Sequence, residues 1–228
     1  MTSPHCCQPD AEAAVKPTTA VSGAAARNVY WHPSTLADDA RAHQFGHAPL
    51  TLWLTGLSGA GKSTLAYALE KRLYEAHRHC AVLDGDNLRH HLNHDLGFTE
   101  ADRTENLRRA AEVARLMNDV GLIVITAFIS PLRSDREMAR EIIGADRFVE
   151  VHVCTALDVC EARDPKGLYA RARGGLIPQF TGVSAPYELP AAPSLRLDTG
   201  ALPLAAATAA LCAHLASWLD IRTLETTR

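Results

Sequence analysis

The sequence has no excess of charge of one sign. Its 228 residues include 23 Lys and Arg against 26 Asp and Glu, which gives a formal net charge of −3. Without a basic surplus, the chain lacks the electrostatic signature of a nucleic-acid-binding protein or of a polybasic membrane anchor. We therefore expect neither a nucleic-acid nor a membrane partner. The 47% hydrophobic and 21% charged content is instead typical of a globular protein.

Recognisable cysteine patterns and long apolar runs are also missing. The six cysteines match neither zinc-site spacing nor a CxxC redox pair, which favours a reduced, cytoplasmic protein. The amino terminus has no apolar signal core. The one long weakly polar stretch, residues 201–221, has apolar side chains at helical spacing. This spacing predicts a helix that packs on a core rather than one that spans a membrane.

Hydrophobic periodicity predicts a single α/β domain. Residues 1–27 are rich in Ala, Thr, Ser and Pro without periodicity, so we expect a disordered tail before a domain over 28–228. The predicted strands are 50–55, 80–83, 122–128, 148–153 and 195–197. The predicted helices are 62–77, 99–121, 134–143 and a last one within 201–221. Their alternation predicts three α/β/α layers around a five-stranded, mainly parallel sheet.

One segment interrupts this alternation. Residues 164–193 are rich in Gly, Pro and Arg and contain no strand-like run. A connection of this length without regular structure is usually functional. We therefore expect a mobile lid at about 164–193.

A phosphate-binding loop follows the first predicted strand. Residues Gly56 to Ser63 fit G-x-x-x-x-G-K-[ST] in full, and a predicted helix follows them. In such a loop, backbone N–H groups and the helix N-terminus bind phosphate oxygens, Lys62 reaches the β- and γ-phosphates, and Ser63 ligates Mg²⁺. The strand–loop–helix context favours this interpretation over a glycine-rich turn with an accidental Lys. The predicted nucleotide-binding residues are Gly56, Leu57, Ser58, Gly59, Ala60, Gly61, Lys62, Ser63 and Thr64.

Two carboxylates after the second predicted strand indicate which class of phosphate-loop protein this is. The guanine-reading string N-K-x-D of GTPases is absent, and the third strand ends in Phe-Ile-Ser-Pro rather than in the Asp of a motor ATPase. Asp84 and Asp86 instead follow the second strand, which faces the acceptor in kinases of small metabolites. Asp86 is the predicted catalytic residue. For Asp84, capping of its own turn remains an alternative to a chemical role.

Cationic and aromatic residues cluster on the predicted acceptor side, and each has two interpretations. Arg89 and Arg103 either clamp an anionic acceptor or belong to a solvated helix face. Phe98 either stacks on a planar base or anchors its loop on the core. Arg163 and Lys166 either neutralise phosphate charge during transfer or belong to a solvated loop.

The motifs together resemble those of the adenylyl-sulfate kinase (APS kinase) family. The matching strings, in family order, include 53–64, 83–89, 95–98, 102–109, 128–131, 163–169 and 197–200. The resemblance covers about residues 28–219. It implies that the chain transfers the γ-phosphoryl group of ATP to the 3′-hydroxyl of adenosine 5′-phosphosulfate (adenylyl sulfate) in sulfate activation, with Mg²⁺.

The resemblance also implies roles for individual residues. Asp86 lies beside the 3′-hydroxyl, and Lys166 lies near the transferring phosphate. Together with Asp86 and Lys166, the implied acceptor-binding residues are Arg89, Phe98, Arg103, Asn106, Ile129, Ser130 and Phe180. The implied donor-adenine residues are Arg163, Thr199 and Gly200. Asp86, Lys62 and Ser130 form the predicted catalytic set; Ser130 is expected to bind in the pocket during direct in-line transfer rather than to form a phosphorylated intermediate.

The resemblance further implies a homodimer and a functional coupling to ATP sulfurylase. Two other functions remain open at this point. The first is a kinase of another small acceptor, such as a nucleoside monophosphate or a sugar acid. The second is a non-catalytic nucleotide-binding module that regulates a partner; the intact Lys62, Ser63 and Asp86 argue against it.

Overall fold

The computed structural model describes residues 29–37 and 39–219. The tail predicted over 1–27 lies outside these residues. The chain divides into a segment that ends at Leu36 and a compact unit that begins at Ala37. In the first of these, residues 29–36 form neither helix nor strand.

A five-stranded sheet forms the centre of the compact unit. Its strands run in the order β2-β3-β1-β4-β5, and every pairing among the described residues is parallel. The strands are β1 (Leu50–Thr55), β2 (Cys80–Asp84), β3 (Ile123–Ala127), β4 (Phe148–Val153) and β5 (Leu195–Leu197). The predicted five-stranded sheet is therefore confirmed, as parallel throughout rather than mainly parallel. β1 lies between β3 and β4. The chain leads from β1 to β2 on one side and from β4 to β5 on the other, and open α/β sheets bind ligands where neighbouring connections diverge in this way.

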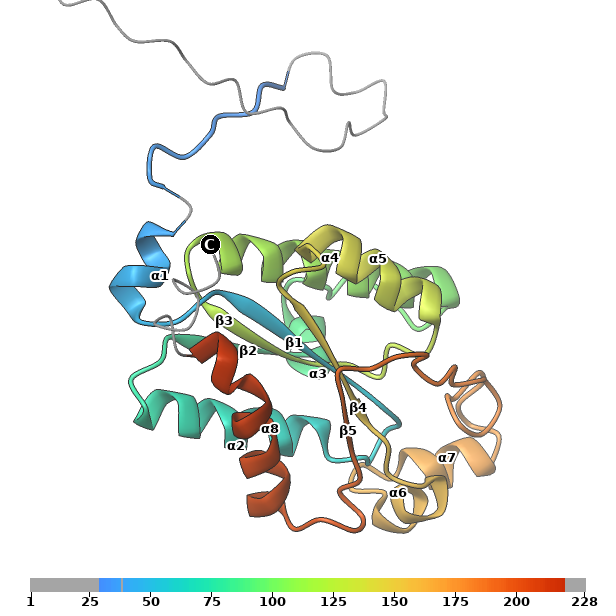
Figure 1. The fold of residues 1–228 in the computed structure, drawn as a ribbon. Coiled ribbons are helices and arrows are strands. Elements are labelled where there is room, and N and C mark those ends of the chain that lie inside the picture. The colour runs from blue at the N-terminus through green and yellow to red at the C-terminus, as the bar shows by residue number, and fades with distance from the viewer. Residues whose placement is uncertain (1–28, 38, 220–228) are drawn as a thin grey trace, which may run out of the picture. The chain divides into compact units, whose positions relative to one another are not determined.

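Helices cover both faces of the sheet. In Figure 1, α4 and α5 lie over one face, and α2 and α8 lie over the other. The helices are α1 (Ala40–Phe45), α2 (Lys62–Glu75), α3 (Gly85–His90), α4 (Glu100–Asp119), α5 (Arg133–Ile143), α6 (Leu157–Arg163), α7 (Leu168–Arg173) and α8 (Leu204–Leu219). This arrangement confirms the predicted three layers.

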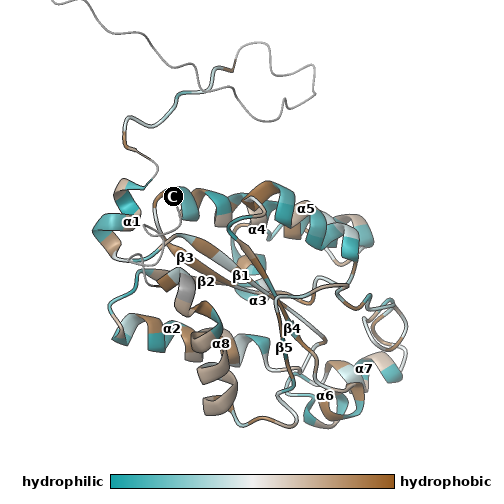
Figure 2. Cartoon of the chain, viewed as in Figure 1, coloured by the Kyte–Doolittle hydropathy of each residue, from teal (hydrophilic) through white to brown (hydrophobic). Residues whose placement is uncertain are grey.

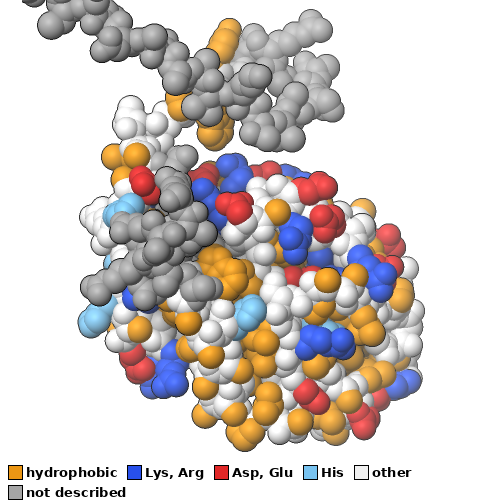
Figure 3. All heavy atoms as spheres, viewed as in Figure 1, with side chains coloured by type: hydrophobic (Ala, Val, Ile, Leu, Met, Phe, Trp, Pro, Cys, Tyr) orange, Lys and Arg blue, Asp and Glu red, His pale blue; other side chains and the backbone are white. Residues whose placement is uncertain are grey.

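The core consists of two apolar clusters, one on each side of the sheet. Leu50, Leu52 and Leu54 of β1 belong to the cluster that packs on α2 and α8, whereas Trp53 belongs to the one that packs on α4 and α5. The division follows from the strand geometry, because successive side chains point to opposite faces. Figure 2 shows the same pattern, with hydrophobic strands inside and hydrophilic outer faces on α2, α4 and α5. In the space-filling view, basic and acidic side chains alternate over α4 and α5 (Figure 3).

The last helix packs on the core as predicted. Ala207, Leu211 and Leu215 of α8 recur every four residues and are buried in the first cluster. No helix within the described residues is long and apolar enough to cross a membrane.

The segment 164–193 differs from its prediction, because it contains a regular element. The six-residue helix α7 runs from Leu168 to Arg173. Its first turn is held by the Asp164 carboxylate, which accepts from the N–H groups of Tyr169 and Ala170 at 3.1 and 3.0 Å. A helix of fewer than two turns has too few residues to show a hydrophobic period, so the sequence pattern missed it, as it missed α3 and α6.

Candidate active site

A cavity of about 1570 Å³ opens at the carboxyl ends of β1, β2 and β3. It brings together residues from the phosphate loop, the acidic turn after β2, the loop after β3 and the segment that contains α7. The predicted residues that line it are Ser58, Gly59, Gly61, Lys62, Ser63, Thr64, Asp86, Arg89, Phe98, Arg103, Asn106, Ile129, Ser130, Arg163, Lys166, Phe180 and Thr199. Gly56, Leu57, Ala60 and Gly200 do not line this cavity, although Leu57, Ala60 and Gly200 each adjoin a residue that does.

Glycine is required at two positions of the phosphate loop. The backbone of Gly59 has φ +74°, and a Cβ there would lie 2.8 Å from the carbonyl oxygen of Cys160. At Gly56, with φ +154°, a Cβ would lie 2.4 Å from the carbonyl oxygen of Val153. The loop therefore packs backbone to backbone against the segments that follow β4, which leaves its own N–H groups available to a phosphate.

Lys62 begins α2 and is buried beneath this loop. Its ammonium donates to the carbonyl oxygens of Gly56 and Leu57, at 2.8 and 2.7 Å. Burial lowers its pKa to about 8, since neither carbonyl carries a compensating negative charge. The ammonium is therefore held in place without a strong anionic partner, which suits a group that binds phosphate.

Asp84 ends β2 and performs two local tasks. One carboxylate oxygen caps α3, accepting from the N–H groups of Asp86 and Asn87 at 2.9 and 3.4 Å. The other accepts a hydrogen bond from the hydroxyl of Ser63 at 2.6 Å. The two interpretations of Asp84 are thus compatible, since the capping residue also contacts the loop Ser. Asp84 was not among the predicted site residues, although its position directly after the predicted strand 80–83 could have indicated that it belongs to the site.

Asp86 and Lys166 form an ion pair across the cavity. Asp86 lies in the first turn of α3, whereas Lys166 comes from the segment 164–193. Their side chains are 63% and 54% exposed, so water screens this pair and it contributes little to stability. Asp86 and Lys166 can therefore separate at little cost when a charged ligand enters the cavity.

Arginines organise the aromatic side chains on the other side of the cavity. Arg89 donates to the carbonyl of Gly97 at 2.7 Å, and its guanidinium lies 4.3 Å from the ring centre of Phe98, which is 68% exposed. Arg103 donates to the carbonyl of Phe98 at 2.9 Å. It also donates to the Gln179 carbonyl and the Thr181 hydroxyl, at 2.8 and 3.1 Å, on both sides of Phe180. Arg103 therefore joins the two loops that carry Phe98 and Phe180.

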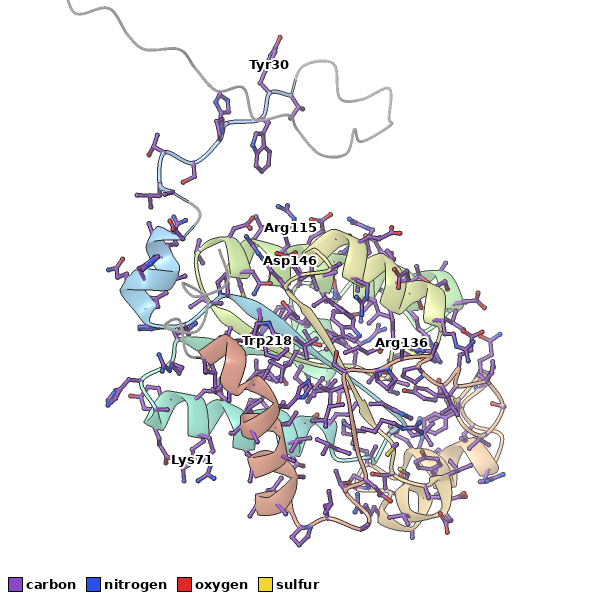
Figure 4. All side chains as sticks on the ribbon, in the orientation of Figure 1. Tyr30, Lys71, Arg115, Arg136, Asp146 and Trp218 are labelled. Atoms are coloured by element: carbon purple, nitrogen blue, oxygen red, sulfur yellow. The ribbon has the colours of Figure 1, made fainter. Side chains whose placement is uncertain are left out.

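A buried arginine fixes the loop after β3. Arg136 donates to the Ser130 carbonyl at 2.6 Å and pairs with Glu150 at 2.8 Å. Figure 4 shows Arg136 inside the molecule, whereas Lys71 and Arg115 extend outward. Ser130 itself is buried with φ +38°, and its hydroxyl accepts from the Trp53 ring N–H at 3.2 Å. The loop that presents Ile129 and Ser130 is therefore rigidly supported from behind.

Arg163 lies at the far end of the cavity, beside the phosphate loop. It donates to the hydroxyl and carbonyl oxygens of Thr199 at 2.9 and 2.7 Å. Thr199 in turn donates to the Ala60 carbonyl at 2.8 Å and contacts the Thr155 hydroxyl at 2.9 Å. Thr155 was not predicted, because a single Thr after a strand carries no motif.

Taken together, a glycine-rich loop on a helix N-terminus, a buried Lys and a carboxylate pair at and just after the end of β2 define a phosphate-loop kinase. Residues 48–198 match the family model described as adenylylsulphate kinase. The chain belongs to this family, which confirms the resemblance seen in the sequence.

Full-length relatives and solved structures agree with this assignment. An adenylyl-sulfate kinase of Shewanella pealeana is 54% identical over 190 residues, which cover 83% of this chain and 93% of the relative. Another, of Shewanella sp. strain W3-18-1, is 55% identical over 199 residues, covering 87% and 97%. The structure of the Mycobacterium tuberculosis APS kinase in complex with AMPPNP and APS has a TM-score of 0.72 and 48% identity, and covers 75% of this chain and 99% of that one.

Proposed function

We propose that this cavity binds ATP and adenylyl sulfate together, and that the chain transfers the γ-phosphoryl group of ATP to the 3′-hydroxyl of adenylyl sulfate. The products are ADP and 3′-phosphoadenylyl sulfate. Family membership makes the chain an ATP-dependent phosphotransferase with an alcohol acceptor, in sulfate activation. We assign both ligands to one cavity because the cavity is continuous. It extends from Arg163 and Lys62 past Asp86 to Phe98 and Phe180.

The donor occupies the phosphate-loop end. The backbone of Ser58 to Gly61 and the ammonium of Lys62 bind its phosphates, and Arg163, Thr199 and Gly200 hold its adenine. The pre-formed hydrogen bonds of Arg163 to Thr199 support this assignment, because they fix the guanidinium plane before a ligand enters.

Lys62 makes donor binding pH-dependent. With a pKa of about 8, about half of the ligand-free molecules carry an uncharged Lys62 at pH 8. Phosphate oxygens beside the amine raise its pKa again, so AMPPNP binding should take up about half a proton at that pH and almost none at about pH 6.5. Calorimetry in buffers of different ionisation enthalpy measures this uptake. Lys62→Arg, which stays charged, is the control; equal uptake by both proteins at pH 8 would exclude Lys62 as its source.

The donor set around Ser63 fits Mg²⁺. A Ser63 hydroxyl and an Asp84 carboxylate 2.6 Å apart supply hard oxygen groups beside the place of the donor phosphates. Mg²⁺ typically takes one or two such protein groups and fills its other positions with water and phosphate oxygens. No group of three or more His, Cys, Asp or Glu that could hold a metal occurs in the described part of the chain, and a site shared with phosphates does not need one. Bound Mg²⁺ would neutralise charge on the phosphates; Ser63 would ligate it and Asp84 would orient that hydroxyl.

Asp86 acts as the base for the acceptor hydroxyl. Lys166 leaves Asp86 for the incoming phosphate, since the exposed pair is weak and the phosphate carries more negative charge. The freed carboxylate then accepts the proton of the 3′-hydroxyl while Lys62 and Lys166 neutralise charge on the transferring group. The segment 164–193 serves as a lid in this proposal, because it carries both Lys166 and Phe180.

The acceptor lies between Phe98 and Phe180, with Ile129, Ser130 and Asn106 along the same wall. Arg89 retains donors for the phosphosulfate, although two of its hydrogen bonds support the loop at Leu96 and Gly97. Three of the five N–H donors of Arg103 already hold the two aromatic loops and set the width of the slot for the adenine, and its other two N–H groups are left for the acceptor.

Replacing Phe98 with Ala tests this slot. Stacking of a base on an aromatic ring contributes about 1–3 kcal/mol, so the KM for adenylyl sulfate should rise about 5- to 150-fold. The KM for ATP should stay within about twofold, because the donor does not contact Phe98. Steady-state kinetics measure both constants. Tyr74→Ala, which removes an aromatic ring that is 77% exposed on α2, should change neither constant; an unchanged acceptor KM in Phe98→Ala would remove this ring from the acceptor site.

The choice of acceptor is tested by ADP release. The purified chain is mixed with Mg-ATP and, in turn, adenylyl sulfate, a nucleoside monophosphate or gluconate. We expect ADP release above the ATP-only background with adenylyl sulfate alone. Release with another acceptor would favour a different small-molecule kinase, and binding of both nucleotides without any release would favour a regulatory module.

Assembly and location are part of the same proposal. The chain forms a homodimer, as the family resemblance implies, although one APS kinase, of Thiobacillus denitrificans, is described as hexameric. Light scattering distinguishes the two states by mass.

The requirement for ATP supports a cytoplasmic location. Because adenylyl sulfate is the product of sulfate adenylylation, the enzyme is functionally coupled to an ATP sulfurylase.

A further inference from the structure

The side chain of Tyr169 connects the two ends of the cavity. Its hydroxyl donates a hydrogen bond to the carbonyl oxygen of Ser58 in the phosphate loop, with an oxygen–oxygen distance of 3.0 Å. Its ring meets the ring of Phe180 edge-on, at 79° and with 5.0 Å between centroids. Ser58 and Phe180 line the cavity, but Tyr169 lies behind both. One residue therefore contacts the proposed donor pocket and the proposed acceptor pocket without touching either ligand.

A second contact joins the same two parts of the chain. We define residues 179–182 as the acceptor turn. Gly182 in this turn has φ +90°, and a Cβ there would lie 3.1 Å from the side chain of Leu57. Leu57 directly precedes Ser58, so the acceptor turn lies against the phosphate loop at Leu57 and is joined to the next residue, Ser58, through Tyr169.

Tyr169 is held firmly enough to transmit a displacement. It is only 1% exposed, and its backbone N–H donates to the Asp164 carboxylate at 3.1 Å. Burial raises the pKa of its hydroxyl, so the group stays protonated and remains a donor. A position that served packing alone would be equally well filled by Phe; the buried hydroxyl is satisfied by the Ser58 carbonyl.

Hydrogen bonds hold the acceptor turn together as one unit. The Phe180 carbonyl accepts from the N–H groups of Val183, Ser184 and Ala185, each at 3.0 Å. Gln179, on the other side, has the left-handed φ of +53° and its carbonyl accepts from Arg103. A shift of the Phe180 ring therefore carries the whole turn with it.

We propose that Tyr169 is a positioning residue that couples the two pockets, so that a donor bound on the phosphate loop raises the affinity for adenylyl sulfate. The identity of the two ligands rests on the proposed function. A donor phosphate fixes the loop at Ser58, and Tyr169 passes this order on to Phe180. Binding of the acceptor then costs less conformational entropy, because the acceptor turn is already ordered. The coupling free energy is equal in both directions.

Calorimetric titration measures this coupling directly. The Kd of adenylyl sulfate is determined for the full chain alone and for the chain saturated with Mg-AMPPNP. For the wild-type chain we expect the Kd to fall about tenfold in the presence of AMPPNP, within the usual range of coupling between sites. We define the Kd ratio as the Kd of adenylyl sulfate without AMPPNP divided by its Kd with AMPPNP. In Tyr169→Phe, which keeps the ring and removes only the hydroxyl, this ratio should approach one while AMPPNP still binds.

Tyr187→Phe is the matched control. It also removes a partly buried tyrosine hydroxyl, whose hydrogen-bonding contact is with the Thr55 hydroxyl at 2.9 Å rather than with Ser58 or Phe180. Its Kd ratio should equal that of the wild-type chain. If Tyr169→Phe keeps the wild-type ratio, or if the wild-type chain shows no ratio above one, the coupling role is wrong while the proposed function stands. If adenylyl sulfate binds the wild-type chain in neither state, the proposed function fails as well.

Hydrogen exchange provides a second readout that needs no variant. AMPPNP alone should slow the exchange of the amides of Val183, Ser184 and Ala185, which close the turn around the Phe180 carbonyl. Unchanged exchange at these three amides when the phosphate loop is saturated would overturn the proposal.

Discussion

Replacing Asp86 with Asn is expected to lower kcat about 10²- to 10⁴-fold, the usual contribution of a positioned general base. Asn has the same shape but cannot take the proton of the 3′-hydroxyl. The fold should be unaffected, because the only ion pair that Asp86 forms among the described residues, with Lys166, is more than half exposed on both sides. Steady-state turnover with saturating Mg-ATP and adenylyl sulfate measures the effect.

Nucleotide affinity is the control for Asp86→Asn. Among the described residues Asp86 makes no hydrogen bond to the phosphate loop; it is joined to the loop through Asp84, which accepts its backbone N–H, and the substitution leaves that N–H in place. The Kd of AMPPNP should therefore stay within about twofold of the wild-type value, a difference of less than about 0.5 kcal/mol. Turnover within a few-fold of wild type would show that Asp86 takes no part in the chemistry.

The second large effect concerns Asp84. Asn is as good a helix N-cap as Asp, so Asp84→Asn keeps the cap of α3 and keeps a polar partner for Ser63. What the substitution removes is negative charge beside the proposed Mg²⁺. The Mg²⁺ concentration that gives half-maximal turnover should rise about 10- to 100-fold, as for other residues that orient a metal ligand.

Comparison of the two variants distinguishes the loss of a general base from the loss of negative charge beside the metal. Asp84→Asn should recover much of its turnover at high Mg²⁺, whereas Asp86→Asn should not. Thermal unfolding of Asp84→Asn without ligands should match the wild-type chain, because the capping bond survives. An unchanged Mg²⁺ requirement in Asp84→Asn would place the metal away from Ser63.

The sequence predicted the framework of this fold because the framework is made by long, locally encoded patterns. β4 was predicted over its full range of Phe148–Val153, because Val149, Val151 and Val153 recur at the period of a strand. The start of α4 was predicted from Thr99, whose hydroxyl accepts from the N–H of Asp102 at 3.1 Å. The phosphate loop was equally readable, because its chemistry resides in consecutive residues.

Contacts between distant residues could not be predicted in this way. Arg103 was expected to clamp an anion, yet its nitrogens hold Phe98 and the acceptor turn, which is 76 or more residues away. Tyr169 contacts a carbonyl 111 residues earlier in the chain. No periodicity or spacing records such pairs, because they arise only when the sheet brings the ends of different strands together.

The chemical identity of the product tests the central claim most directly. The purified chain is incubated with Mg-ATP and adenylyl sulfate, and the product is analysed by mass spectrometry and by ³¹P NMR. The account predicts ADP together with adenylyl sulfate that carries one additional phosphoryl group on the 3′-oxygen, formed only when Mg²⁺ is present. A phosphoryl group at any other position, or ADP release without a phosphorylated nucleotide, would contradict it.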